Sequence, residues 1–147
     1  MEKDVLLSMH GLQFDILDSA GNAADVEVIT PAKYYRRGKS HFLLYDEEDE
    51  SGNTTGNIIR INGKTIEVTK KGVINAHMLF EEKKKNLTDY STPFGNIMIG
   101  VETNKVRVDE QENRISVQVD YGLDINYERL SDCTFRMDIS PRRHITQ

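Results

Sequence analysis

The side chains best suited to metal binding or nucleophilic attack are four histidines and a single cysteine. The histidines His10, His41, His77 and His144 show no H-x-H or H-x-x-x-H spacing, and one cysteine cannot supply the thiolates of a structural zinc site. Cys133 also shares the apolar face of its segment, which favours a buried, inert thiol over a nucleophile. Since the sequence also lacks a nucleophile elbow and Gly-rich phosphate-binding motifs, we predict no catalytic residue, no metal site and no cofactor.

The acidic run Asp46–Glu50 is a second feature that suggests metal chemistry. A calcium loop of the EF-hand type needs a glycine at its sixth position and a bidentate glutamate at its twelfth, but Ser51 and Asn57 stand there. We therefore interpret residues 46–56 as a solvated acidic loop whose charges keep neighbouring molecules apart. A weak divalent-ion contact is the alternative.

The clusters of basic residues in this acidic chain are short. The stretch Tyr34-Tyr35-Arg36-Arg37 alone combines cations with the aromatic rings that stack on nucleic-acid bases. The net charge of -5 disfavours sequence-independent binding to nucleic acid or to an anionic membrane. We therefore expect no nucleic-acid or membrane partner.

The composition describes a globular chain that forms a single domain over residues 1–147. The 147 residues are 37% hydrophobic and 29% charged, with a mean hydropathy of -0.56. No apolar run is long enough to cross a bilayer as a helix, and Met1–Asp4 leads into patterned sequence without a signal-peptide apolar region. We therefore expect a cytoplasmic protein, with residues 141–147 as a tail.

A two-residue hydrophobic rhythm dominates the carboxyl-terminal third of the chain. Apolar and polar side chains alternate over Ile115–Asn126 and again over Cys133–Ile139, a period typical of strands. The polar residues 126–132 between them predict the connection of an antiparallel hairpin. The first strand would be long for this domain, so we expect it to bend at Gly122.

Changes in the parity of this alternation predict curved strands. The apolar positions over residues 5–9 resume on the opposite parity over 12–16, which indicates a β-bulge at His10-Gly11. A second change of parity predicts another bulge near Asn104-Lys105. Curvature of this kind favours a closed sheet.

Turn residues divide the chain into about nine or ten strands. Asn62-Gly63 predicts a tight hairpin, because both residues tolerate the positive φ angles of a type I′ turn. Helix propensity competes only over Leu79–Asn86, where the absence of a helical apolar stripe favours a strand. We predict an all-β fold, a closed antiparallel up-and-down barrel with about 8–10 strands. An open sandwich is the alternative.

Several of these segments together resemble a known family. The residues are Tyr34-Tyr35, Tyr45-x-Glu47, Phe80, Tyr90-x-Thr92-x-Phe94-Gly95 and the final strand pair. In this order and spacing they resemble the YwiB-like family of uncharacterised small bacterial calycin-like β-barrel proteins, over nearly the whole chain. The resemblance implies a lipocalin-like closed barrel and carries over no catalytic residue.

A barrel of about eight strands either fills with side chains or holds one small ligand. Tyrosine suits the lining of such a site, because it combines an apolar ring with a hydroxyl group. The alternation directs Arg60 and Arg107 outward, and either would need an anionic partner if it pointed inward. The candidate ligand-binding residues are Tyr34, Tyr45, Tyr90, Phe94, Tyr121, Arg60 and Arg107, with core and rim packing as the alternative role of the tyrosines.

These observations leave three functional hypotheses. The first is a non-enzymatic barrel that binds a small apolar or anionic molecule. The second is a structural or protein-interaction module with a packed core and no ligand. The third is an enzyme in which titratable groups converge without a recognisable motif; the candidates are Glu47, Glu81, Glu82 and His77.

Overall fold

The computed structural model describes residues 3–11 and 27–142, and the ordered elements in these ranges are all strands. Most of the strands bury alternate side chains, as the two-residue period predicts. The strands are β1 (Lys3–His10), β2 (Glu27–Arg37), β3 (Ser40–Glu48), β4 (Thr54–Asn62), β5 (Thr65–Gly72), β6 (Ala76–Glu81), β7 (Lys85–Thr92), β8 (Gly95–Gln111), β9 (Arg114–Ile125) and β10 (Glu128–Pro141).

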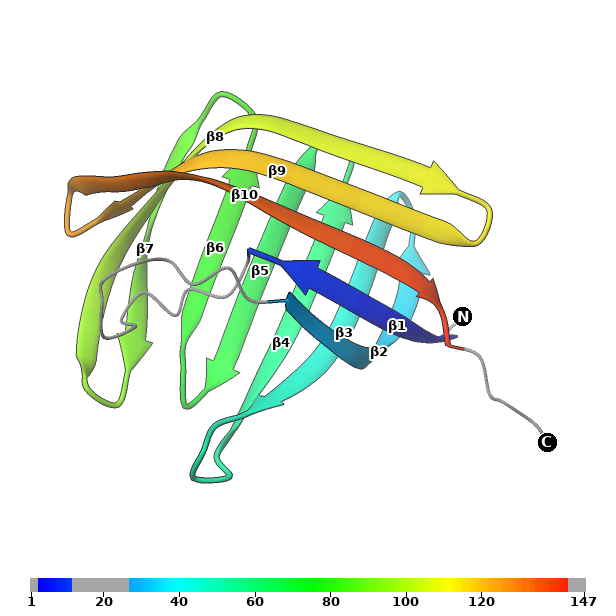
Figure 1. Ribbon diagram of the computed structural model, residues 1–147, viewed down its shortest axis with the longest axis horizontal. Coiled ribbons are helices and arrows are strands. Elements are labelled where there is room, and N and C mark those ends of the chain that lie inside the picture. Colours follow the sequence, from blue (N-terminus) through cyan, green and yellow to red (C-terminus); the bar gives the residue numbers. More distant parts are fainter. Residues whose placement is uncertain (1–2, 12–26, 143–147) are drawn as a thin grey trace.

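The ten strands form one antiparallel up-and-down sheet that is nearly closed into a barrel (Figure 1). The order is β6-β5-β4-β3-β2-β1-β10-β9-β8-β7, so β1 joins the two halves of the chain by pairing with both β2 and β10. At the seam between β6 and β7 the described residues form no continuous ladder. The backbones of Asn75 and Ser91 exchange two hydrogen bonds of 2.9 Å there, and the Asn86 amide donates to the Leu79 carbonyl at 3.0 Å. The predicted all-β barrel is thus confirmed.

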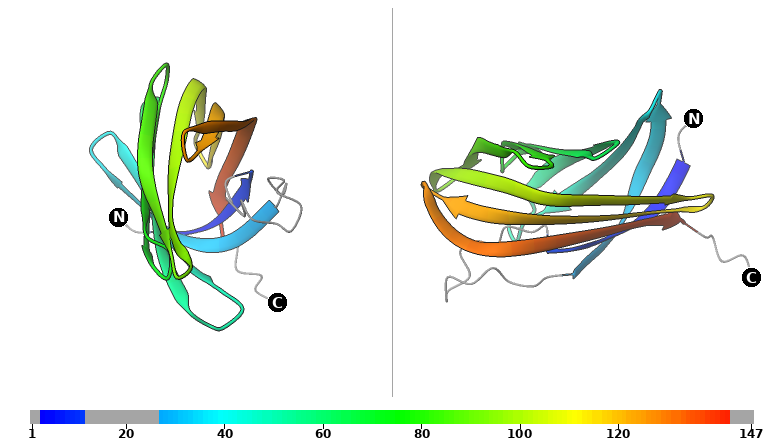
Figure 2. Two further views of the ribbon diagram at one scale, coloured as in Figure 1. Left: turned by 90° about the vertical axis from the view of Figure 1, so that its left-hand side faces the viewer. Right: turned by 90° about the horizontal axis from the view of Figure 1, so that it is seen from above.

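Curvature enters the sheet at a bulge, as the parity of the alternation predicts (Figure 2). The register between β8 and β9 shifts between Thr103 and Lys105. The Glu82 carboxylate accepts the backbone N–H of Val106 at 3.0 Å beside this bulge, and this bond holds the pKa of Glu82 below its usual range. At the other predicted bulge, Gly11 has a φ of 82°. The expected strand over 12–16 lies outside the described residues.

The hairpins confirm the predicted strands and correct three of their turns. Asn62 pairs with Thr65, so the β4–β5 turn consists of Gly63 and Lys64, one residue later than predicted. Only the first of these two residues has a positive φ, 58°, as in a type II′ turn. The uncertain segment 79–86 is extended at both ends and contains a turn between β6 and β7, so its interpretation as strand rather than helix is confirmed.

The predicted connection over residues 126–132 is wrong, because β9 and β10 are joined by Asn126 and Tyr127 alone. Both residues have positive φ, 49° and 71°, the requirement of a type I′ turn. The Asn126 N–H donates to the Met98 carbonyl at 2.8 Å and holds the turn against β8. This tertiary bond explains how a tyrosine occupies a conformation that its side chain disfavours.

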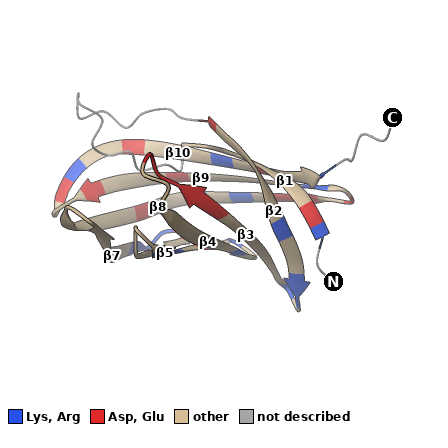
Figure 3. Ribbon diagram, turned by 90° about the horizontal axis from the view of Figure 1, so that it is seen from below, with Lys and Arg blue, Asp and Glu red and all other residues tan. Residues whose placement is uncertain are grey.

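The acidic loop is also shorter than the predicted range 46–56. β3 continues to Glu48 and β4 begins at Thr54, so acidic residues extend along the end of β3 (Figure 3). The carboxylate of Asp49 accepts the backbone N–H groups of Ser51 and Asn53 at 2.9 and 2.8 Å. Asp49 therefore stabilises the turn through these hydrogen bonds, a role that the net charge of the loop does not predict.

The barrel centre is filled by three aromatic rings from strands on opposite walls. Phe80 of β6 meets Tyr121 of β9 and Phe135 of β10 edge-on, with ring centroids 5.2 Å apart in both pairs. Burial raises the pKa of Tyr121, which therefore stays neutral. Side chains therefore fill the centre of this barrel, whereas a wider barrel would have space there for a ligand.

Thr103 provides a direct test of packing in this interior. Its side chain is fully buried, and its hydroxyl group has no hydrogen-bond partner among the described residues. An unsatisfied buried hydroxyl costs about 1 kcal/mol or more, so we expect Thr103→Val to raise the free energy of unfolding by about 1 kcal/mol in urea titrations. The control Thr103→Ser keeps the hydroxyl and loses a methyl group, and it should lower that free energy. A destabilised valine variant would contradict the prediction.

A charged cluster covers the outer face near the β9–β10 turn. Asp124 is only 4% exposed because Lys85 and Arg129 lie over it, with the Arg129 Nε donating to Asp124 Oδ1 at 2.7 Å. Gly122 makes room for this arginine, since a Cβ there would approach its guanidinium to 2.3 Å. Hydrogen bonds from Lys85 and Arg129 hold the pKa of Asp124 below its usual range.

The lowered pKa of Asp124 predicts a pH-dependent contribution to stability. The folded pKa lies below the unfolded value of about 3.9, so the stabilisation is complete above about pH 4 and is lost as the pH falls through the folded pKa. We expect Asp124→Asn to lower the free energy of unfolding by about 1–2 kcal/mol at neutral pH and by much less near about pH 2. Urea titrations across this range measure the difference.

The matched control for this prediction is Asp132→Asn. Asp132 binds the same arginine, Arg129, at 3.2 Å, but its side chain is 85% exposed. Its removal should change the free energy of unfolding by less than about 0.5 kcal/mol at any pH. Equal losses in the two variants, or a loss for Asp124→Asn that does not vary with pH, would contradict the assignment.

The part of the chain that the structure describes contains no helix long and apolar enough to span a membrane.

Candidate functional site

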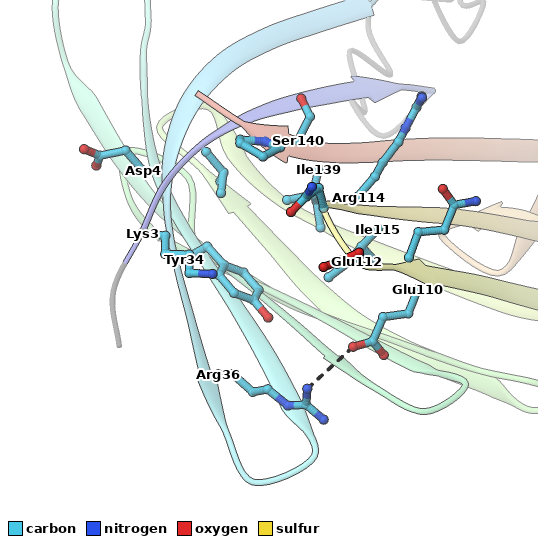
Figure 4. Close-up of a pocket in the computed structure, with 14 residues that line it drawn as sticks. Lys3, Asp4, Tyr34, Arg36, Glu110, Glu112, Arg114, Ile115, Ile139 and Ser140 are labelled. Carbon is cyan, nitrogen blue, oxygen red and sulfur yellow. Dashed lines mark ion pairs between the residues drawn. The ribbon is translucent and has the colours of Figure 1, made fainter. Parts of the chain in front are cut away.

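The barrel has a hollow mouth at one end, with a volume of about 390 Å³ (Figure 4). Its apolar floor is formed by the inward-facing side chains of Val5, Ile115 and Ile139. Ile139 of β10 pairs with Ile115 of β9, and Val5 of β1 pairs with Pro141, which is two residues from Ile139 on β10. The mouth therefore continues the apolar core outward to solvent.

The polar wall of the mouth comes from the end of β2 and from the hairpin that joins β8 to β9. Tyr34 pairs with Lys3 at the start of β1, Arg36 lies two residues further along β2, and both face Glu110 (Figure 4). The length of β8 explains this arrangement, since its 17 residues carry the hairpin past the end of β7. A hydroxyl, a guanidinium and a carboxylate thus stand beside an apolar floor.

A chain of polar contacts runs along this wall. The Tyr34 hydroxyl lies 2.7 Å from Nδ1 of His41, whose side chain is only 5% exposed. On the other side of the imidazole, Nε2 lies 3.4 Å from Oε2 of Glu110. The second oxygen of that carboxylate lies 3.6 Å from Nη1 of Arg36. Each residue in this series of polar contacts is therefore positioned by the next one.

Burial raises the pKa of Tyr34, with Arg36 opposing the shift and Glu110 adding to it. The hydroxyl is therefore protonated at neutral pH. A protonated tyrosine has one O–H to donate and two lone pairs that accept, so it can bind a polar group of a ligand.

Opposite charges balance around the mouth. Three cationic and three acidic residues line it, and they are Lys3, Arg36, Arg114, Asp4, Glu110 and Glu112. Most of these charges also have partners, since Arg114 binds Asp138 at 3.1 Å and Lys33 binds Asp4. The balance favours a neutral ligand over an anion.

Of the predicted ligand-binding residues, Tyr34 is the one that lines the mouth. Tyr45 and Tyr90 are buried among the core residues, where burial raises the pKa of Tyr45. The Lys70 ammonium group donates to the carboxylate of Glu47, on the same strand as Tyr45, at 2.7 Å and to the side-chain amide oxygen of Asn57 at 2.8 Å. This buried polar cluster (Glu47, Asn57, Lys70) lies on the inward faces of β3, β4 and β5.

The structure does not bring the remaining candidates to the mouth. Tyr121 belongs to the aromatic centre, and Phe94 is 99% exposed in the turn between β7 and β8. Arg60 points outward, as predicted, and its guanidinium lies 5.9 Å from the ring centre of Phe42. Arg107 is also on the exposed outer face, as predicted.

Sequence reasoning missed the roles of His41 and Glu110. His41 lies two residues before Leu43, so the alternation of β3 predicts that its side chain points inward, but it does not predict the contact with Glu110 on β8.

The other residues considered for chemistry lie apart from the mouth. His77 binds Glu67 at 2.8 Å on the outer face. No three metal-ligating side chains converge within the described ranges 3–11 and 27–142. Cys133 is half-buried, less enclosed than predicted, and lies 3.3 Å from the hydroxyl of Ser131.

A second hollow of about 420 Å³ lies on the outer face of β2–β5. The outward-facing Leu44 and Ile58 lie side by side in it, in register on β3 and β4, and Lys33 and Lys71 border them. The absence of a side chain at Gly56 deepens this hollow. It is an apolar surface that, like the mouth, is open to solvent.

Comparison with known families identifies the fold. Residues 13–137 match the model of a family described as a domain of unknown function, DUF1934. The chain belongs to the DUF1934 family. The structure is similar to the crystal structure of the ywiB protein from Bacillus subtilis, with a TM-score of 0.76 and 18% identity over 97% of this chain and 94% of that one. No curated protein matches the sequence.

These comparisons confirm the predicted resemblance to YwiB-like proteins. At 18% identity the likeness concerns the fold. The similarity therefore supports the arrangement of the strands in this DUF1934 barrel, and the properties of its mouth follow from its own side chains.

Proposed function

We propose that this DUF1934 protein binds a small, largely apolar molecule at the barrel mouth, without catalysing a reaction. The observation that carries the proposal is the cavity of about 390 Å³, which combines an apolar floor with the polar wall of Tyr34, Arg36 and Glu110. Small-molecule sites commonly have this construction, in which apolar contact provides affinity and a few polar groups provide orientation.

The test is methyl NMR of the isotope-labelled protein during titration with a library of neutral aromatic fragments. Fragments that bind at the mouth should shift the methyl signals of Ile115 and Ile139 together. The methyl signals of Ile59 and Ile66, which lie deep in the core, should shift much less. If no fragment shifts the mouth methyls at its solubility limit, the proposal is wrong.

The outer hollow favours a protein-interaction module as the second candidate function. Leu44 and Ile58 form an apolar surface, and contact with another protein would remove this surface from water. In the same titrations, shifts centred on Ile58 rather than on the mouth would support this candidate. Loss of those shifts in an Ile58→Ser variant would confirm their location.

A further inference from the structure

The polar chain along the mouth determines which nitrogen of His41 carries the proton. A neutral imidazole has one N–H donor and one acceptor nitrogen, and neighbouring groups select between the two tautomers. The Glu110 carboxylate can only accept, and it lies 3.4 Å from Nε2. Its negative charge therefore favours the proton on Nε2 and leaves Nδ1 as the acceptor.

The state of His41 in turn orients the hydroxyl of Tyr34. With Nδ1 as an acceptor at 2.7 Å, Tyr34 donates its one O–H to His41. The lone pairs that remain on the Tyr34 oxygen are then the part of the hydroxyl available to the mouth, whose wall includes Tyr34 (Figure 4). A ligand that hydrogen-bonds to Tyr34 must therefore supply the hydrogen.

We propose that the mouth selects neutral ligands whose polar end is a hydrogen-bond donor, such as a hydroxyl or an amide N–H, because Glu110 and His41 commit the Tyr34 proton to the protein. This inference rests on the ligand-binding function proposed above. Glu110 and His41 act as positioning residues, and Tyr34 makes the contact. The balanced charges of the rim exclude a preference for anions.

The tautomer of His41 is tested by ¹⁵N NMR at about pH 8, above the ordinary titration range of histidine. The expected spectrum shows a pyridine-like Nδ1 and a pyrrole-like Nε2 for this residue. Glu110→Ala should shift the population toward the other tautomer, whereas Glu112→Ala, which changes another acidic residue of the mouth, should not. A pyrrole-like Nδ1 in the wild-type protein would overturn the inference.

The selectivity is tested with three small monosubstituted benzenes, which are phenol, anisole and benzoate. Anisole replaces the hydroxyl hydrogen of phenol by a methyl group, and benzoate carries a charge. One hydrogen bond is worth about 0.5–1.5 kcal/mol, so phenol should bind the wild-type protein about two- to twelvefold more tightly than anisole and more tightly than benzoate. Dissociation constants come from the shifts of the Ile115 and Ile139 methyl signals.

Two tyrosine variants locate the selecting group. Tyr34→Phe should abolish the advantage of phenol over anisole. Tyr35→Phe is the matched control, because Tyr35 is the next residue and stacks on Phe42 of the outer face, with ring centroids 4.8 Å apart. It should keep the full advantage.

The outcomes separate this inference from the proposed function. If phenol and anisole shift the mouth methyls with equal affinity, or benzoate binds most tightly, the selectivity is wrong and the mouth remains a binding site. If none of the three probes shifts those methyls, both the selectivity and the proposed function are wrong.

Discussion

Replacement of Phe80 by alanine is expected to lower the free energy of unfolding by about 4 kcal/mol, the largest effect among these predictions. The Phe80 ring is fully buried and packs edge-on against Tyr121 and Phe135 at centroid distances of 5.2 Å. Its loss would remove both aromatic contacts and leave a cavity between opposite walls of the barrel. Urea unfolding monitored by near-ultraviolet circular dichroism measures the change.

The matched control is Phe94→Ala, the same substitution at a side chain that is 99% exposed. It should change the free energy of unfolding by less than about 0.5 kcal/mol. A loss below about 1.5 kcal/mol for Phe80→Ala would mean that the barrel centre collapses readily around the cavity. The aromatic cluster would then not be the main link between the two walls.

The second large effect is expected at Lys70, which lies almost completely buried on the inward face of β5. Its ammonium group donates to Glu47 at 2.7 Å and to Asn57 at 2.8 Å. Lys70→Met keeps the length of the side chain but leaves a carboxylate and a buried amide without this donor. We expect the free energy of unfolding to fall by about 3 kcal/mol, because removing one member of a buried pair leaves the charge of the other member uncompensated.

Lys71→Met is the control for the loss of a lysine charge, since Lys71 is adjacent in sequence and exposed on the outer face. Its effect should stay within about 0.5 kcal/mol. A double variant, Glu47→Gln with Lys70→Met, should recover part of the lost stability, because the remaining carboxylate charge is removed. No recovery would indicate that Glu47 reaches solvent freely once Lys70 is gone.

The two expected effects are the reason to place the proposed ligand at the mouth and not in the barrel centre. The aromatic rings fill the barrel centre, and Lys70 with its partners occupies an inward-facing region of β3, β4 and β5. The mouth combines an apolar floor with polar groups next to solvent. A small ligand can enter there without displacing the core, whose close packing is costly to disturb.

Sequence reasoning succeeded where the relevant interactions are local. The alternation around Ile115–Asn126 identified β9, and the change of parity near Asn104-Lys105 identified the bulge in β8. Both follow from the period of two that an extended backbone imposes on its side chains. The same alternation placed Arg60 and Arg107 outward.

Prediction failed where a distant contact overrides local preference. Residues 126–132 are polar, which is typical of a long connection, yet the strands continue to a turn of two residues. The turn is held by a bond from Asn126 to Met98 on a third strand. Nothing in the sequence indicated that Gly122 makes room for the Arg129 side chain.

The sequence by itself determined that this chain forms antiparallel curved strands, because side-chain parity and turn chemistry act over a few neighbouring residues. The tertiary structure alone decided which polar groups meet. His41 contacts Glu110 only because β8 extends past β7 and its hairpin reaches the end of β2 and the start of β3. This contact depends on the order and the length of the strands. The alternation of hydrophobic residues does not specify either, because it is the same whichever strands become neighbours.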